Sequence, residues 1–185
     1  MSNNLLAAAR PDRRIERTKG ALLGALLALL ADKPWDEVSV QDVCECAGIG
    51  RSTFYLHYAH KEALLAAGLS DLQVRLREAG RRQADKPFGF LEALVDHVEE
   101  QRQVFRSIIG RRSGQAVQRL FRETVEQLVK DDLASLPAGP EHDLTARFLA
   151  AGIVDAVALW IDAPQRMPKA EVVDCLRVAS GRVVR

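Results

Sequence analysis

Residues 39–65 read SVQDVCECAGIGRSTFYLHYAHKEALL, and this stretch decides the fold of the first part of the chain. Ser39 is a suitable N-cap and Asp42, three residues later, is a short capping-box acid, so a helix is predicted to begin directly after Ser39. Gly48 is placed to end that helix, because a residue without a Cβ adopts the left-handed conformation at low cost. A second helix is predicted from Arg51 to Tyr58. Two short helices around a glycine turn are typical of a helix-turn-helix unit that reads DNA.

The second helix has one apolar side. Phe54 and Tyr58 are four residues apart and share a face, so they are predicted to enter the core of the small unit together with Val43 and Ile49. The remaining surface of this helix is polar and carries Arg51, Ser52, Thr53, Tyr55 and His57. A helix that reads a DNA groove needs such a hydrogen-bonding surface.

The segment AGIGRSTFYLHYAHKEALL also resembles the N-terminal DNA-binding signature of the TetR family of bacterial transcriptional regulators. The residues in register with that signature are Ala47, Gly48, Ile49, Thr53, Phe54, Tyr55, His57, Tyr58, Lys61, Glu62 and Leu64. Gly50 departs from it, because the family usually has Ser or Thr there, and a contact at this position is expected to come from the backbone N–H. The resemblance, with the helix that precedes it, covers roughly the first third of the chain, and its partner would be double-stranded operator DNA.

Roles for the DNA-facing residues follow from the resemblance and from side-chain chemistry. Arg51, Ser52 and Thr53 are predicted to contact base edges, and the guanidinium fork of Arg51 suits guanine. The predicted contacts to phosphate or to the groove wall come from Tyr55, His57 and Lys61, with further contacts from Lys19, Ser39 and Gly50. For His57, a packed surface imidazole is the alternative.

The composition is that of an ordinary folded protein. The chain has 185 residues, 48% hydrophobic and 28% charged, which argues against disorder. The apolar run Ala21 to Ala31 is too short to span a bilayer, and no cleavable signal peptide is visible, so a cytoplasmic protein without a membrane partner is predicted. The net charge is only +1, but Arg10 to Lys19 is locally basic. This segment is either an arm that reaches phosphates or a solvated helix start.

Helical periodicity runs through the chain, and the fold class predicted is all-α with about nine helices. The predicted domains are a helix-turn-helix domain with a basic arm, residues 1–62, and a helical ligand-sensing and dimerisation domain, residues 63–185. The predicted helices are 13–31, 40–47, 51–58, 61–83, 88–100, 103–109, 113–133, 141–161 and 168–180.

The predicted helix from Glu141 to Ile161 is apolar nearly all round, so it must be buried on more than one side. The resemblance implies a homodimer, and this helix and the last one are its expected interface. The interface residues predicted are Leu149, Ile153, Val157, Val172 and Leu176. The alternative is a central core helix of a monomer.

The resemblance also implies an unknown small-molecule effector bound in the larger domain. The residues predicted to line its pocket are Phe88, His97, Phe105, Phe121, Phe148 and Trp160, for each of which ordinary core packing is the alternative. Arginines at 106, 111, 112, 119 and 122 fit either an anionic effector or a solvated surface.

These features together predict a DNA-binding regulator, a repressor that its effector releases from the operator, with no catalytic residues, cofactor or metal. One alternative is a redox-responsive regulator that uses Cys44 or Cys46. The other is a small helical enzyme, which is disfavoured because the four histidines are scattered and neither HExxH nor a glycine-rich phosphate loop is present.

Overall fold

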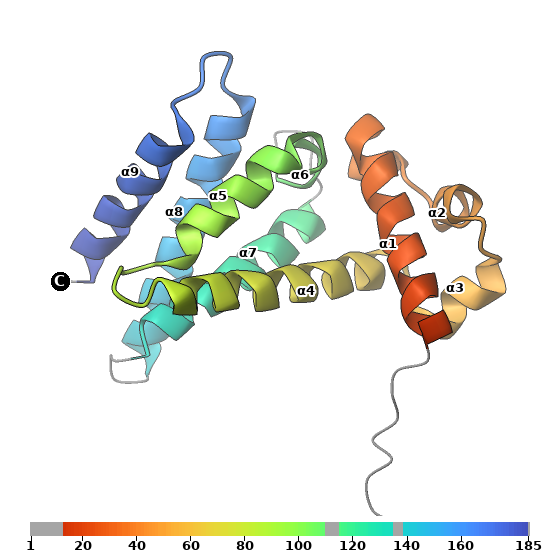
Figure 1. Ribbon diagram of the computed structural model, residues 1–185, viewed down its shortest axis with the longest axis horizontal. Helices are drawn as coiled ribbons and strands as arrows, with labels where there is room; N and C mark the ends of the chain where they lie inside the picture. Colours follow the sequence, from red (N-terminus) through yellow and green to blue (C-terminus); the bar gives the residue numbers. More distant parts are fainter. Residues whose placement is uncertain (1–12, 110–114, 135–138, 185) are drawn as a thin grey trace, which may run out of the picture.

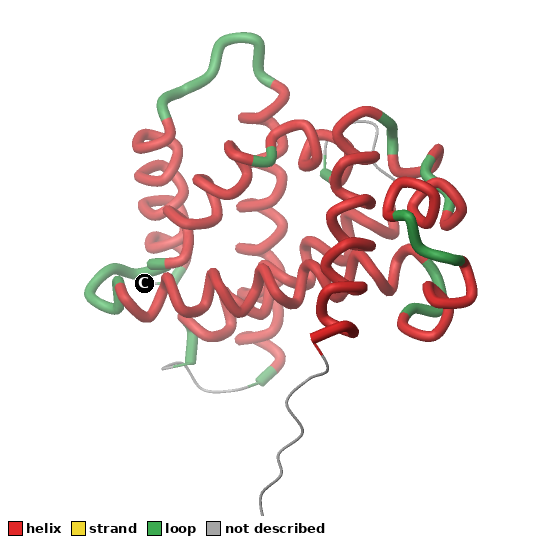
Figure 2. Tube along the Cα trace, turned by 45° about the vertical axis from the view of Figure 1, so that its right-hand side comes forward, coloured by secondary structure: helices red, strands yellow, loops and turns green. Residues whose placement is uncertain are grey.

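The computed structural model describes residues 13–109, 115–134 and 139–184, and every regular element in them is helical (Figures 1 and 2). The helices are α1 (Arg13–Asp32), η1 (Trp35–Glu37), α2 (Val40–Ala47), α3 (Arg51–His57), α4 (Lys61–Arg82), α5 (Phe90–Glu100), α6 (Arg102–Ile108), α7 (Gln115–Asp132), α8 (Pro140–Asp162) and α9 (Lys169–Val183). The all-α prediction with nine helices is therefore confirmed over the described residues, and the short 3₁₀ turn η1 is an addition.

Two bundles are joined by the long helix α4. Figure 1 shows α1, α2 and α3 at one end of the molecule and α5 to α9 at the other, with α4 running between them. Its apolar stripe is Leu65, Leu69, Leu72 and Leu76, all buried, and it contacts α1, α5 and α7. The predicted boundary after residue 62 falls in the first turn of α4. Because α4 contacts both bundles, the division into 1–62 and 63–185 stays a prediction.

The turn between α4 and α5 explains why α5 begins two residues later than predicted. Phe88 has a φ of 54°, which no helical residue adopts. Gly89 follows it in a crowded position, where a Cβ atom would lie 2.9 Å from the carbonyl oxygen of Gln83 and 3.0 Å from that of Gly80. The chain must complete this close turn before a helix can start at Phe90.

Helix α6 ties the small bundle to α8. The hydroxyl of Ser107 donates to the carbonyl oxygen of Leu30 at the end of α1, at 2.7 Å. On the same helix, Arg102 donates through Nε and Nη2 to the carbonyl oxygen of Ile161 near the end of α8, at 3.0 and 2.5 Å. The last turns of α1 and α8 are thereby linked through one short helix.

Helix α8 is the only helix of the described residues that is long and apolar enough to cross a membrane by length and composition, a test that a central core helix also passes. Here α8 packs against α5, α6, α7 and α9. Its buried side includes Ile153, Val154 and Val157. On α7, the buried carboxylate of Glu126 accepts from Arg147 of α8 at 3.3 Å and pairs with Lys130 at 3.1 Å.

The burial pattern of α8 and α9 corrects the predicted dimer interface. The five residues predicted for it are all buried within one protomer, with exposed fractions of 0 to 8%: Leu149, Ile153, Val157, Val172 and Leu176. They are core residues and present almost no surface to a second chain. The apolar side chains that α8 and α9 leave exposed are others, namely Leu144, Phe148, Leu159, Val178 and Val183.

Candidate nucleic-acid interface

The start of α2 is fixed by short-range hydrogen bonds. The Ser39 hydroxyl accepts from the backbone N–H of Asp42 at 3.1 Å, and the Asp42 carboxylate accepts from the backbone N–H of Ser39 at 2.8 Å. This is the predicted capping box. The same bonds from Ser39 hold the pKa of the Asp42 carboxyl below its ordinary value. The hydroxyl of Ser39 also donates to Asp42 at 2.8 Å, so it is already engaged within the protein.

The turn after α2 has the predicted glycine geometry. Gly48 has a φ of 64° and ends α2, and the N–H of Ile49 donates to the carbonyl oxygen of Cys44 at 2.9 Å. Ile49 is partly buried against the core. Gly50 is then the N-cap of α3, without a side-chain hydrogen bond, and its carbonyl oxygen accepts from the N–H groups of Thr53 and Phe54.

Helix α3 turns its polar residues outward because Phe54 anchors it. Phe54 is fully buried, and its ring packs against Tyr55 and Tyr58 with centroid distances of 5.4 and 5.9 Å. Arg51, Ser52 and Tyr55 are exposed, whereas Thr53 and His57 are partly buried. The His57 ring lies 6.4 Å from that of Tyr58. The first turn of α3 therefore presents a polar surface to solvent.

One exposed residue of α3 was not among the predicted contacts. Leu56 is 80% exposed, although it is apolar. Its position four residues after Ser52 could have signalled this, because residues i and i+4 of a helix share a face.

Lys61 has a structural role that its sequence position did not reveal. Its ammonium group donates to the carbonyl oxygens of Trp35 at 2.8 Å and Val38 at 2.7 Å. It also lies 4.5 Å from the centroid of the Trp35 ring. Two of its three donors are therefore used to fasten α4 to the α1–α2 connection. Lys19 is partly buried and lies 3.6 Å from the carboxylate of Glu16.

Comparison with known proteins supports this geometry. Residues 22–67 match the family model of the bacterial regulatory proteins of the tetR family. Residues 85–179 match a second family model, the transcriptional regulator C-terminal region. The chain belongs to the TetR family of transcriptional regulators. Members of this family are DNA-binding transcriptional regulators and are generally not enzymes.

Curated relatives of the TetR-family chain align mainly over its N-terminal part. The repressor LfrR of Mycolicibacterium smegmatis is 35% identical over 85 residues, which cover 46% of this chain and 43% of that protein. The regulator EthR of Mycobacterium tuberculosis is 41% identical over 58 residues, 29% of this chain and 27% of that protein. The chain therefore spans less than half the length of these relatives.

Solved structures of TetR-family regulators cover nearly all of the chain. One from Streptococcus agalactiae has a TM-score of 0.69 and 28% identity, and it covers 91% of this chain and 96% of that one. NalD of Pseudomonas aeruginosa has a TM-score of 0.62 at 19% identity, with 93% and 98% covered. The second likeness shows the fold alone.

The six residues predicted to line an effector pocket do not come together in this TetR-family structure. The His97 ring packs on Phe105 and the Phe105 ring packs on Phe121, with centroid distances of 5.6 and 5.2 Å, and both phenylalanines are buried in the core. Phe148 is 64% exposed on α8, so its assignment to a pocket is corrected. The remaining two lie elsewhere, Phe88 buried in the α4–α5 turn and Trp160 beside a groove between α8 and α9.

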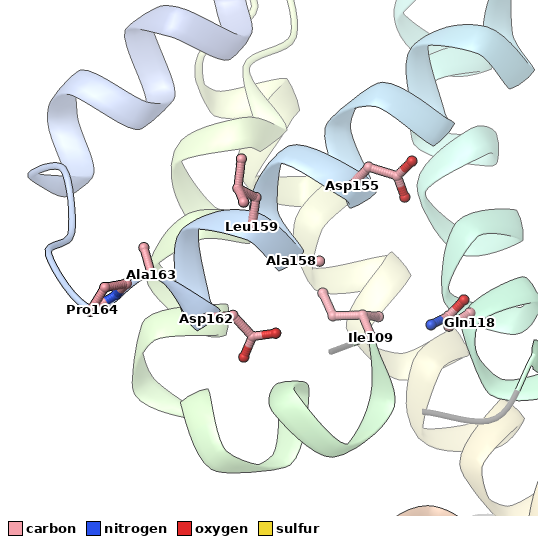
Figure 3. Close-up of a pocket in the computed structure, with 8 residues that line it drawn as sticks. All are labelled: Ile109, Gln118, Asp155, Ala158, Leu159, Asp162, Ala163 and Pro164. Atoms are coloured by element: carbon pink, nitrogen blue, oxygen red, sulfur yellow. The ribbon is translucent and has the colours of Figure 1, made fainter. Parts of the chain in front are cut away.

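A groove of about 440 Å³ lies where α6, α7 and α8 approach one another. Figure 3 shows Asp155, Leu159 and Asp162 of α8 along it, with Ile109 and Gln118 on the facing elements. Both carboxylates have partners, because Arg106 lies 3.1 Å from Asp162 and Arg122 lies 3.5 Å from Asp155. None of the six predicted pocket residues lines this groove.

The environment of Cys44 does not favour redox control through this residue. Cys44 is 4% exposed, and burial raises the pKa of its thiol. A thiol of this kind forms little thiolate and reacts slowly with oxidants. Cys46 and Cys175 are exposed, and no disulfide joins the three.

Proposed function

We propose that this chain acts as a homodimeric repressor that binds operator DNA through α3 and is released from it by a small-molecule effector. The observation that carries the proposal is the polar first turn of α3. Arg51 and Ser52 are exposed there, on a helix that Phe54 fixes to the core. Arg51, Ser52 and Thr53 are the proposed base contacts, because side chains in the first turn of a reading helix reach base edges.

The phosphate contacts proposed lie around this helix. Tyr55 is exposed and His57 is partly exposed. Both are proposed to contact the wall of the DNA groove. Gly50 offers its backbone N–H, and Lys19 and Ser39 lie on the neighbouring elements. Lys61 is proposed to position α4, since its donors are occupied by Trp35 and Val38. The relative LfrR is a transcriptional repressor, and this supports repression as the mode of control.

Dimerisation is proposed through the exposed apolar side of α8 and α9. Leu144, Phe148 and Leu159 are 64 to 70% exposed on α8, and Val178 is 52% exposed on α9. Because a two-fold dimer presents two α3 helices, the operator is expected to carry half-sites about 34 Å apart or a multiple of it. In Figure 1 the helices α8 and α9 lie at the opposite end of the molecule from α3.

The effector is proposed to bind the larger bundle and to bias a two-state equilibrium. The conformational change is proposed to pass through α6, because side chains of α6 hydrogen-bond to both α1 and α8. A coupling free energy of about 1 to 3 kcal/mol is enough for useful control. The protein is further proposed to be cytoplasmic, without catalytic activity, cofactor or membrane partner, with α8 serving as a core helix.

The test is a fluorescence-anisotropy titration with the DNA that flanks the gene, or with sites obtained by random-site selection. Wild-type protein is expected to bind one sequence tightly in the presence of scrambled competitor. Arg51→Ala should weaken that binding at least about fivefold, since a bidentate contact to guanine is worth about 1 to 3 kcal/mol. Arg82→Ala is the matched control, because its side chain is 76% exposed at the far end of α4. Binding that ignores sequence and Arg51 alike would refute the proposal.

A further inference from the structure

Leu56 is the most exposed large apolar side chain of the described residues, and it belongs to α3. Single exposed leucines are common on protein surfaces and need no explanation in themselves. This one differs in its location, because the other exposed side chains of α3 are the ones proposed to contact DNA.

Helical geometry places Leu56 at the centre of the outward face. Successive residues of a helix are about 100° apart, so Ser52 and Leu56 lie about 160° and 200° from the buried Phe54. They stand side by side and point directly away from the core. Tyr55 and Thr53 flank them at about 100° on either side of Phe54. The exposed fractions agree, since Leu56 is 80% exposed and Phe54 is fully buried.

An apolar side chain at that position restricts what it can face in DNA. Leucine has no donor or acceptor, so placing it against the polar edge of a base removes water without replacing its hydrogen bonds. The major groove carries one apolar group in unmodified DNA, the C5-methyl of thymine.

We propose that Leu56 is a specificity-determining residue that packs against a thymine methyl in each half-site. This rests on the proposed function, because it requires α3 to lie in the major groove. Arg51 and Ser52 then read hydrogen-bonding edges one turn earlier, and Leu56 adds a methyl contact beside them.

The experiment compares selected sites and then single methyl groups. Random-site selection is carried out in parallel with wild-type protein, with Leu56→Ala and with Val74→Ala, a control that shortens a 50%-exposed side chain on α4. In the wild-type site each thymine is next replaced by deoxyuridine, which removes the methyl group alone, and affinity is measured by anisotropy.

Wild-type and Val74→Ala proteins are expected to select thymine at one position per half-site. Deoxyuridine there should weaken their binding about fourfold per half-site, which corresponds to burial of one methyl-sized group. Leu56→Ala should accept any base at that position, bind thymine and deoxyuridine equally, and keep the rest of the consensus.

Two results would overturn the inference while leaving the proposed function intact. In the first, the wild-type protein selects a site but no deoxyuridine weakens it. In the second, Leu56→Ala keeps the same thymine preference and the same loss with deoxyuridine. If the wild-type protein selects no sequence at all, the proposed function fails and the methyl contact fails with it.

Discussion

The ammonium group of Lys61 joins two segments that are distant in sequence. It donates to the carbonyl oxygens of Trp35 and Val38 and lies against the Trp35 ring. We expect Lys61→Ala to lower the free energy of unfolding by about 1.5 to 3 kcal/mol, because hydrogen bonds to a charged group would be lost. Urea denaturation followed by circular dichroism measures this loss.

Lys86→Ala provides the control for Lys61→Ala, because Lys86 is exposed and its ammonium group makes only a long contact, 3.5 Å, to the side-chain oxygen of Gln83. We expect this variant to unfold at nearly the wild-type urea concentration. If Lys61→Ala weakened DNA binding at unchanged stability, Lys61 would be a phosphate contact and its structural assignment would be wrong.

His97 gives a second prediction at the scale of a single residue. Burial, aided by the charge of Arg75, lowers the pKa of its imidazole below 6.5. Its ring lies edge-to-face on Phe105. As the pH falls through 6.5, the unfolded chain therefore takes up a proton before the folded chain does, and stability decreases.

We accordingly expect His97→Gln to remove part of the stability loss between pH 7 and pH 5. Urea midpoints measured at both pH values for the variant and the wild type provide the comparison. Identical pH dependence in the two proteins would show that His97 does not contribute.

At the scale of an element, α2 depends on its first turn because it is only eight residues long. We expect Ser39→Ala to destabilise the protein by about 1 kcal/mol, since it removes an N-cap side chain. The hydrogen bonds from Ser39 lower the pKa of the Asp42 carboxyl. The contribution of Asp42 to the free energy of unfolding is therefore complete above the unfolded pKa of 3.8 and is lost as the pH falls through the lower folded pKa.

Asp42→Asn should therefore flatten the acid limb of the stability curve below about pH 4, a range that follows from the lowered pKa. Thermal unfolding from pH 5 to pH 2.5 measures this limb. An unchanged limb would mean that the capping box does not persist in solution.

At the scale of the whole molecule, the exposed apolar side chains of α8 and α9 form the proposed dimer interface. We expect the double variant Phe148→Glu, Leu159→Glu to be a folded monomer, because both residues are 64 to 70% exposed in one protomer and two buried carboxylates per chain oppose association. Light scattering coupled to size exclusion gives the mass. Operator affinity should fall as well, since the two α3 helices are no longer held at a fixed spacing.

Val74→Glu is the matched control for the dimer variant, because Val74 is exposed on α4 away from that surface. We expect it to keep the wild-type mass. A double variant that remained dimeric would place the interface elsewhere on the molecule.

Local chemistry made much of the fold predictable. The capping box of Ser39 and Asp42 and the left-handed turn at Gly48 depend on bonds between residues three to five positions apart. The i, i+4 pair of Phe54 and Tyr58 identifies the inner face of α3 in the same way. The predicted start of α5 was two residues early, because the close packing at Gly89 involves the end of α4.

The sequence by itself thus determined the helical fold, the helix-turn-helix unit and the polar surface of α3, since short-range hydrogen bonds and helical periodicity define them. Only the tertiary structure decided which side of α8 is free, because a helix that is apolar all round has no periodicity to mark a buried face. It alone decided the role of Lys61, whose bonding partners lie 23 and 26 residues away. It also decided that the rings of His97, Phe105 and Phe121 pack on one another, because the sequence does not distinguish aromatic side chains that pack together from those that surround a cavity.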